Sequence, residues 1–151
     1  MPRKHLFVLA DGGRARYVER SAGNGHYVTV EEIDHTAALQ QLRKELRASP
    51  PARAISSTSP RRSAVGREDY YRPAKEAFMV EVADRAGELV RQRKLDSIVL
   101  AAPSQLIGQL RVRLEAQATV AGAIRKDLTK TPDHELGAWL NDIPRGGQLP
   151  V

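Results

Sequence analysis

Two aspartates stand where acidic side chains could hold a metal ion. Asp11 follows the apolar run at residues 5–10, and Asp127 ends the run at residues 120–127. If these runs are neighbouring strands of one sheet, their carboxylates could together hold magnesium, as they do in some nucleases. A structural role fits too, because Asp11 opens a Gly-Gly turn and Asp127 can cap the chain or pair with Lys126. No third acid falls on a suitable element, so the structural role is favoured, and a Mg²⁺-dependent nuclease or ester hydrolase is the alternative.

A second candidate site lies in a long polar loop expected at residues 48–73. Between Arg43 and Lys75 there are nine Lys or Arg and three Asp or Glu, so this window carries the whole surplus of a chain whose net charge is +6. Such a loop attracts phosphates, and tyrosines inside it could stack on bases. The candidate phosphate or nucleic-acid contacts are Arg61, Arg62, Arg67, Arg72, Lys75, Ser104, Tyr70 and Tyr71. The alternative is a solvated arginine-rich loop whose tyrosines pack on the sheet.

Composition gives other chemistries less support. The absence of cysteine excludes disulfides and thiolate metal sites and fits a reducing cytosol. The four histidines show no metal-ligand spacing, and no base is evident for the serines of the polar loop. The apolar run near the N-terminus is too short for a signal peptide core, and no segment approaches the length of a membrane span. We therefore expect a cytoplasmic protein with no metal, no cofactor and no membrane partner.

Hydrophobic periodicity predicts the elements that position these residues. Residues 5–10, 14–20 and 26–33 read as three strands of an antiparallel meander joined by Gly-rich turns. The predicted elements that follow are a short helix ending at Pro50, the polar loop, a helix at 74–94, a strand at 95–102, a helix at 104–114, a strand at 120–127 and a helix at 132–140. Ser104 is the expected N-cap of its helix, and Leu136 and Trp139 are the expected anchors of the last helix.

This order predicts one α/β domain over residues 1–141 and an irregular tail over residues 142–151. A meander followed by two helix–strand units implies a ribonuclease-H-like mixed sheet in the order 3-2-1-4-5, covered by about four helices. Strands one, four and five would then be parallel, so Asp11, Ala102-Pro103 and Asp127 would lie at one carboxyl edge, where open α/β sheets bind ligands. The starts of the last three helices should open at the same edge and favour anions.

Four segments also carry a resemblance to a known family: VLADGGRARYVE, AFMVEVADRAGEL, LDSIVLAAPSQLIGQLR and IRKDLTKTPDHEL. In combination they resemble the bacterial host-attachment protein family, which is named for a protein required for attachment to host cells. That family is related to the middle domain of archaeal and eukaryotic peptide release factors. The resemblance implies the same sheet, and a polar loop that carries Gly-Gly-Gln in release factors.

The corresponding loop here, at about residues 49–72, has no such tripeptide, although Gly146-Gly147-Gln148 occurs in the tail. A flexible tail does not brace a catalytic glutamine, so peptidyl-tRNA hydrolysis is not expected. The leading hypothesis is a non-catalytic cytoplasmic module that binds RNA, tRNA or the ribosome through its basic loop. An adhesion-related factor that acts indirectly in host attachment is a further alternative.

Overall fold

The computed structural model describes residues 4–48, 60–141 and 143, and of residues 46–48 and 60–72 it describes the backbone alone. The strands are β1 (His5–Ala10), β2 (Arg14–Arg20), β3 (Tyr27–Asp34), β4 (Ser97–Ala102) and β5 (Val120–Arg125). The helices are α1 (Thr36–Ala48), α3 (Pro60–Gln92), α4 (Ser104–Glu115) and α5 (Gly137–Leu140), with a 3-10 turn, η1, at Asp133–Glu135. None of the helices in this described part combines the length and apolar character that crossing a bilayer requires.

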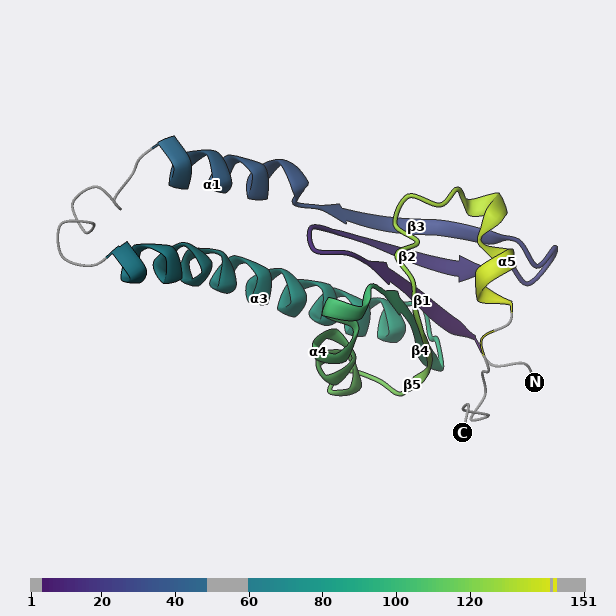
Figure 1. Ribbon diagram of the computed structural model, residues 1–151. Coiled ribbons are helices and arrows are strands. Elements are labelled where there is room, and N and C mark those ends of the chain that lie inside the picture. Colours follow the sequence, from purple (N-terminus) through teal and green to yellow (C-terminus); the bar gives the residue numbers. More distant parts are fainter. Residues whose placement is uncertain (1–3, 49–59, 142, 144–151) are drawn as a thin grey trace.

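The five strands form one mixed sheet in the order β3-β2-β1-β4-β5, which confirms the predicted α/β fold. β1 pairs antiparallel with β2, and β2 pairs antiparallel with β3. β1 pairs parallel with β4, and β4 pairs parallel with β5. Figure 1 shows α3 and α4 on one face of the sheet and α5 on the other. The carboxyl ends of β1, β4 and β5 therefore share one edge, as predicted.

The larger core lies between the sheet and the two helices α3 and α4. Phe78, Val82, Ala86 and Leu89 recur at helical spacing, so one stripe of α3 faces the sheet. Alternate residues of each strand meet that stripe, because successive strand side chains point to opposite faces. Strand and α4 residues buried in this core include Leu6, Val8, Ala15, Tyr17, Ile98, Leu100, Leu110 and Leu114. Each fully buried leucine contributes about 2 kcal/mol relative to an exposed one.

A smaller core fills the opposite face of the sheet. Its strand residues are the other half of the alternation, namely Phe7, Leu9, Val18, Tyr27, Val99 and Ala101. The chain after β5 covers them with Leu128, Leu136, Leu140 and Ile143. This cover contains only a 3-10 turn of three residues and a helix of four. This segment therefore lacks long helices whose apolar stripes could hold it on the sheet.

The start of the long helix differs from the prediction. α3 begins at Pro60 instead of residue 74, so residues 60–72 of the predicted loop are helical and Pro73 lies inside the helix. Both prolines suit a helix start, where the missing N–H costs nothing, and the sequence pattern assigned the start to the wrong one. The residues between them include four arginines, which favour helix. The rest of the predicted loop, residues 49–59, lies outside the described residues.

Three smaller expectations at helix ends were wrong. Ser104 is the first residue of α4 and not its cap, because the Pro103 carbonyl already accepts the Ile107 amide at 3.0 Å. The predicted helix at residues 132–140 divides into η1 and α5. Leu136 is fully buried as expected, but Trp139 is 39% exposed, since the side of α5 that faces the sheet is taken by Leu140.

Candidate functional site

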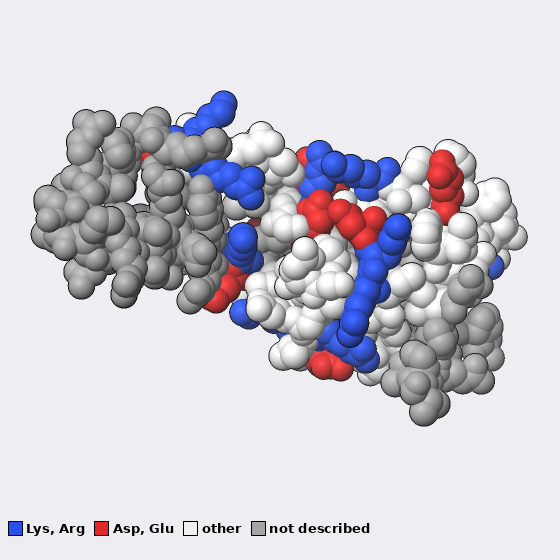
Figure 2. Space-filling view, viewed as in Figure 1, with Lys and Arg blue, Asp and Glu red and all other residues white. Residues whose placement is uncertain are grey.

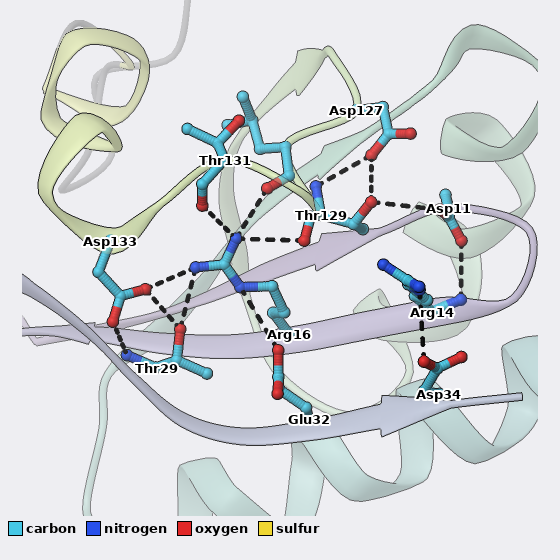
Figure 3. A network of polar contacts seen from close by, with 11 residues as sticks. Asp11, Arg14, Arg16, Thr29, Glu32, Asp34, Asp127, Thr129, Thr131 and Asp133 are labelled. Carbon is cyan, nitrogen blue, oxygen red and sulfur yellow. Dashed lines mark hydrogen bonds and ion pairs between the residues drawn. The ribbon is translucent and has the colours of Figure 1, made fainter. Parts of the chain in front are cut away.

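The structure brings the two candidate acids together at the carboxyl edge. The Thr129 Oγ1 atom lies 2.6 Å from Asp127 Oδ1 and 3.2 Å from Asp11 Oδ2 (Figure 3). A hydroxyl has one proton, so it donates to one carboxylate at a time. The topology predicted this meeting, because Asp11 follows β1 and Asp127 follows β5 at the same edge of the sheet.

Both carboxylates also hold their own turns. Asp11 Oδ1 accepts the amides of Gly13 at 2.8 Å and Arg14 at 2.7 Å, which closes the turn between β1 and β2. Asp127 Oδ1 accepts the Thr129 amide at 2.9 Å. Among the described residues there is no group of three or more His, Asp or Glu side chains placed to hold a metal ion. The hydrogen bonds support the structural role that the sequence favoured for both aspartates.

A buried arginine that the sequence analysis did not single out organises the neighbouring loop. Arg16 is 7% exposed, and its guanidinium donates to the carbonyls of Leu128 at 3.0 Å and Thr131 at 2.5 Å. It also bonds Thr29 Oγ1 at 3.0 Å and Asp133 Oδ1 at 2.5 Å (Figure 3). We call these five residues the Arg16 network. It binds the chain after β5 to the second face of the sheet.

The electrostatics of the network favour an ionised Asp133. Burial by itself raises the pKa of Asp133, but the Thr29 hydroxyl and amide and the Arg16 guanidinium outweigh it and hold that pKa below its usual value. A sequence signal for the network did exist. Val18 is an apolar residue of the smaller core, and Arg16 lies two residues earlier on the same face of β2, so strand alternation indicates that Arg16 faces the same core.

The described parts of the basic window, residues 43–48 and 60–75, project from the edge that holds the two aspartates. We call residues 43–75 the basic arm. It contains the end of α1 and the first part of α3, and Figure 1 shows both helices extending past the β1–β2 turn and away from the sheet. Lys75 is exposed on α3, and Ser104 is exposed at the start of α4. The side chains of the other predicted contacts, Arg61, Arg62, Arg67, Tyr70, Tyr71 and Arg72, lie outside the described ones.

One expectation about helix dipoles was wrong. α3 was predicted to begin at the carboxyl edge and to offer free N–H groups there, but it begins at Pro60, thirteen residues before Pro73. α4 does begin beside the edge, directly after β4. Among the helix starts described, the first turn of α4 therefore remains the one that could favour an anion near the two aspartates. The other two elements after β5, η1 and α5, are too short to carry a strong dipole.

Outside the basic arm, acidic and basic side chains are intermixed, and several of them form ion pairs. Figure 2 shows both signs together on the face that carries α3 and α4. Arg85 binds Glu31 through two nitrogens, each 2.6 Å from a carboxylate oxygen, and this hydrogen bonding lowers the pKa of Glu31. Arg93 pairs with Glu19, and Arg14 Nε lies 3.4 Å from Asp34. Five arginines outside the basic arm thus have carboxylate partners, namely Arg14, Arg16, Arg85, Arg93 and Arg111.

A search of curated proteins finds no match to the chain. A family model described as "Protein required for attachment to host cells" matches residues 6–140, from the second residue of β1 to the end of α5. The chain therefore belongs to the host-attachment protein family.

Proposed function

We propose that this protein is a non-catalytic module that binds RNA, tRNA or a ribosomal surface through the basic arm. The observation that carries the proposal is the separation of charge. Residues 43–75 hold nine Lys or Arg against three Asp or Glu, which equals the surplus of the whole chain. Arginines of the body meet carboxylates at short distances. The positive potential is thus concentrated on one projecting element.

A projecting basic helix suits a phosphate backbone better than it suits a small substrate. Each arginine or lysine that neutralises a phosphate releases a condensed counterion, so affinity grows with the number of contacts and falls with salt. Tyr70 and Tyr71 lie between arginines in the sequence, where aromatic rings can stack on unpaired bases. We expect such binding to be tolerant of sequence, because phosphate contacts carry no base information.

The non-catalytic part of the proposal rests on the two aspartates. Asp11 and Asp127 each use one carboxylate oxygen to accept backbone amides of their own turns, and the Thr129 hydroxyl lies between the two carboxylates. A ribosomal target also accords with the release-factor resemblance, without the tripeptide that hydrolysis would need. Such a module would act in the cytoplasm, and fractionation of native cells would contradict this if the protein were found on the cell surface.

The direct test measures binding of a fluorescent single-stranded RNA at several salt concentrations. One variant replaces Arg61, Arg62, Arg67 and Arg72 with Gln. The control replaces four basic residues at the opposite end of the molecule, Lys4, Arg91, Lys94 and Arg113, and so removes the same charge. Because each lost phosphate contact lowers the slope of log K against log salt by about 0.7, the arm variant should lose up to roughly three units of slope.

The control variant should keep nearly the full slope, since its four residues lie near the other end of the sheet. Equal losses in both variants would show that total charge, and not the basic arm, governs binding. No RNA binding by the wild-type protein at about 50 mM salt, where phosphate contacts are strongest, would eliminate the proposal. Circular dichroism of both variants establishes that they remain folded.

A further inference from the structure

The sheet divides at the end opposite the basic arm. β1 and β2 pair from Ala10 and Ala15 only as far as Phe7 and Val18. Beyond this point β2 continues to pair with β3 as far as Arg20 and Tyr27, while β1 continues to pair with β4 as far as His5. The two halves of the sheet therefore separate, and they leave an opening between the first residues of β1 and the last residues of β2.

A cavity of about 750 Å³ occupies this opening. We call it the crevice, and we define it by Lys4, Arg20 and Arg93, which supply cations, and by Val28, Val30 and Leu95, which supply apolar surface. Its volume falls within the range of about 300–1,000 Å³ that small-molecule sites occupy in proteins. Strand separation explains why residues from both faces of the sheet line one cavity.

The charged groups of the crevice leave a positive excess. Arg93 pairs with Glu19, the carboxylate of the lining. Arg20 donates from Nε to the Gly25 carbonyl at 3.0 Å and lies 5.8 Å from the centre of the Tyr27 ring, and no carboxylate of the described residues forms an ion pair with it. The Lys4 ammonium likewise has no ion pair among the described side chains.

The apolar part of the crevice is open to solvent. Val28 is 48% exposed, and Val30 on the same strand is half-buried. Val30 packs against the edge of the larger core, whereas Val28 lies farther along β3 and is only half covered. A partly exposed apolar wall beside unpaired cations suits a molecule that has both an apolar body and a negative head.

We infer that the crevice binds a small organic anion, in which a carboxylate, sulfonate or phosphate meets Lys4 and Arg20 and a hydrocarbon or aromatic body lies against Val28 and Val30. The guanidinium of Arg20 offers a planar pair of donors for such a head group. The site is separate from the basic arm, which extends from the other end of the sheet (Figure 1). It therefore adds a ligand class to the protein that the RNA-binding proposal does not include.

A matched pair of dyes tests both halves of this inference. The anionic dye 8-anilinonaphthalene-1-sulfonate and its uncharged relative N-phenyl-1-naphthylamine share the same aromatic body. We expect the anionic dye to bind at one site per chain and more tightly than the neutral dye. In the double variant Lys4→Gln, Arg20→Gln, the affinity for the anionic dye should fall at least tenfold, whereas the affinity for the neutral dye should stay within about twofold, because only one dye carries a charge.

Two further variants make the result interpretable. Arg91→Gln with Lys94→Gln removes the same charge from exposed residues at the same end of the molecule that do not line the crevice, and it should leave both affinities unchanged. Val28→Glu places a negative charge on the apolar wall at a half-exposed position that folding does not depend on, and it should weaken the anionic dye most. The four-arginine variant of the basic arm should bind both dyes normally.

Each other outcome overturns the inference. If the Arg91 and Lys94 variant weakens the anionic dye as much as the crevice variant, general charge attraction explains the binding. If the arm variant abolishes dye binding, the dye site lies on the basic arm. Absence of saturable binding at about 1 mM dye, which corresponds to a free energy weaker than about −4 kcal/mol, would show that the crevice holds no such ligand.

Discussion

The two faces of the sheet are covered in different ways. On one face α3 and α4 bury apolar stripes, and their backbone hydrogen bonds are satisfied within each helix. On the other face the chain after β5 has little regular structure, so its carbonyls need partners from elsewhere. Arg16 supplies them at Leu128 and Thr131. An irregular cover therefore depends on specific polar contacts, whereas a helical cover depends mainly on periodic apolar residues.

The largest expected effect comes from shortening one leucine on each face. Leu110 and Leu136 are both essentially fully buried. Leu110→Ala should cost about 4 kcal/mol, because long helices around the site cannot collapse into the cavity, and Leu136→Ala should cost about 2–3 kcal/mol, because a short segment can. Urea denaturation of both variants measures this. Equal costs would mean that the irregular cover is as rigid as the helical one.

The next largest effect should come from Arg16→Met, which removes the donors of the Arg16 network but keeps an apolar stem. It leaves buried carbonyls and the Asp133 carboxylate without their partner, so we expect a loss of about 3 kcal/mol. Arg14→Gln is the control, because Arg14 lies on the same strand in a half-exposed ion pair and should cost less than about 1 kcal/mol. Urea denaturation gives both values. A cost for Arg16→Met as small as that of Arg14→Gln would refute the importance of the network.

A smaller effect is expected from a buried hydrogen bond on the helical face. The Tyr17 hydroxyl donates to the Val82 carbonyl of α3 at 2.9 Å, and burial raises the pKa of Tyr17. Tyr17→Phe should cost only about 1 kcal/mol, since the Val82 carbonyl still receives the amide one turn later in the helix. Thermal unfolding checks this. A loss near that of Arg16→Met would show that this face also depends on a specific polar contact.

The smallest effect concerns acid. The pKa of Asp133 is lower in the folded protein than in the unfolded chain, so its ionised form contributes stability above the unfolded value near pH 4, and that contribution disappears as pH falls through the folded value. Asp133→Asn should therefore flatten the fall in melting temperature between about pH 5 and pH 2.5. Glu135→Gln, an exposed neighbour, is the control and should follow the wild-type curve.

Most of the fold follows from local patterns in the sequence. The apolar run at residues 5–10 and the turns after it specify the meander, and the helical spacing from Phe78 to Leu89 specifies the buried stripe of α3. The parallel strands then place Asp11 and Asp127 at one edge, where Thr129 joins them. These features depend on residues near one another in the chain and on general rules of connection.

Other features depend on contacts between distant residues, and local patterns do not identify the partners. The Arg16 network joins β2 to residues more than a hundred positions later. The crevice exists because β1 and β2 separate while each still pairs with its other neighbour. The start of α3 was misplaced for a different reason, since Pro60 and Pro73 give the same local signal. The functional roles of the arm arginines stay predictions.

The length of α3 determines how far the protein can reach. Its 33 residues, at a rise of 1.5 Å each, make a rod roughly 50 Å long. One end lies beside the separated strands, where Arg93 pairs with Glu19, and the other carries the arginine-rich turns away from the sheet. A single chain of modest size can therefore touch two objects that are several nanometres apart, as a spacer does.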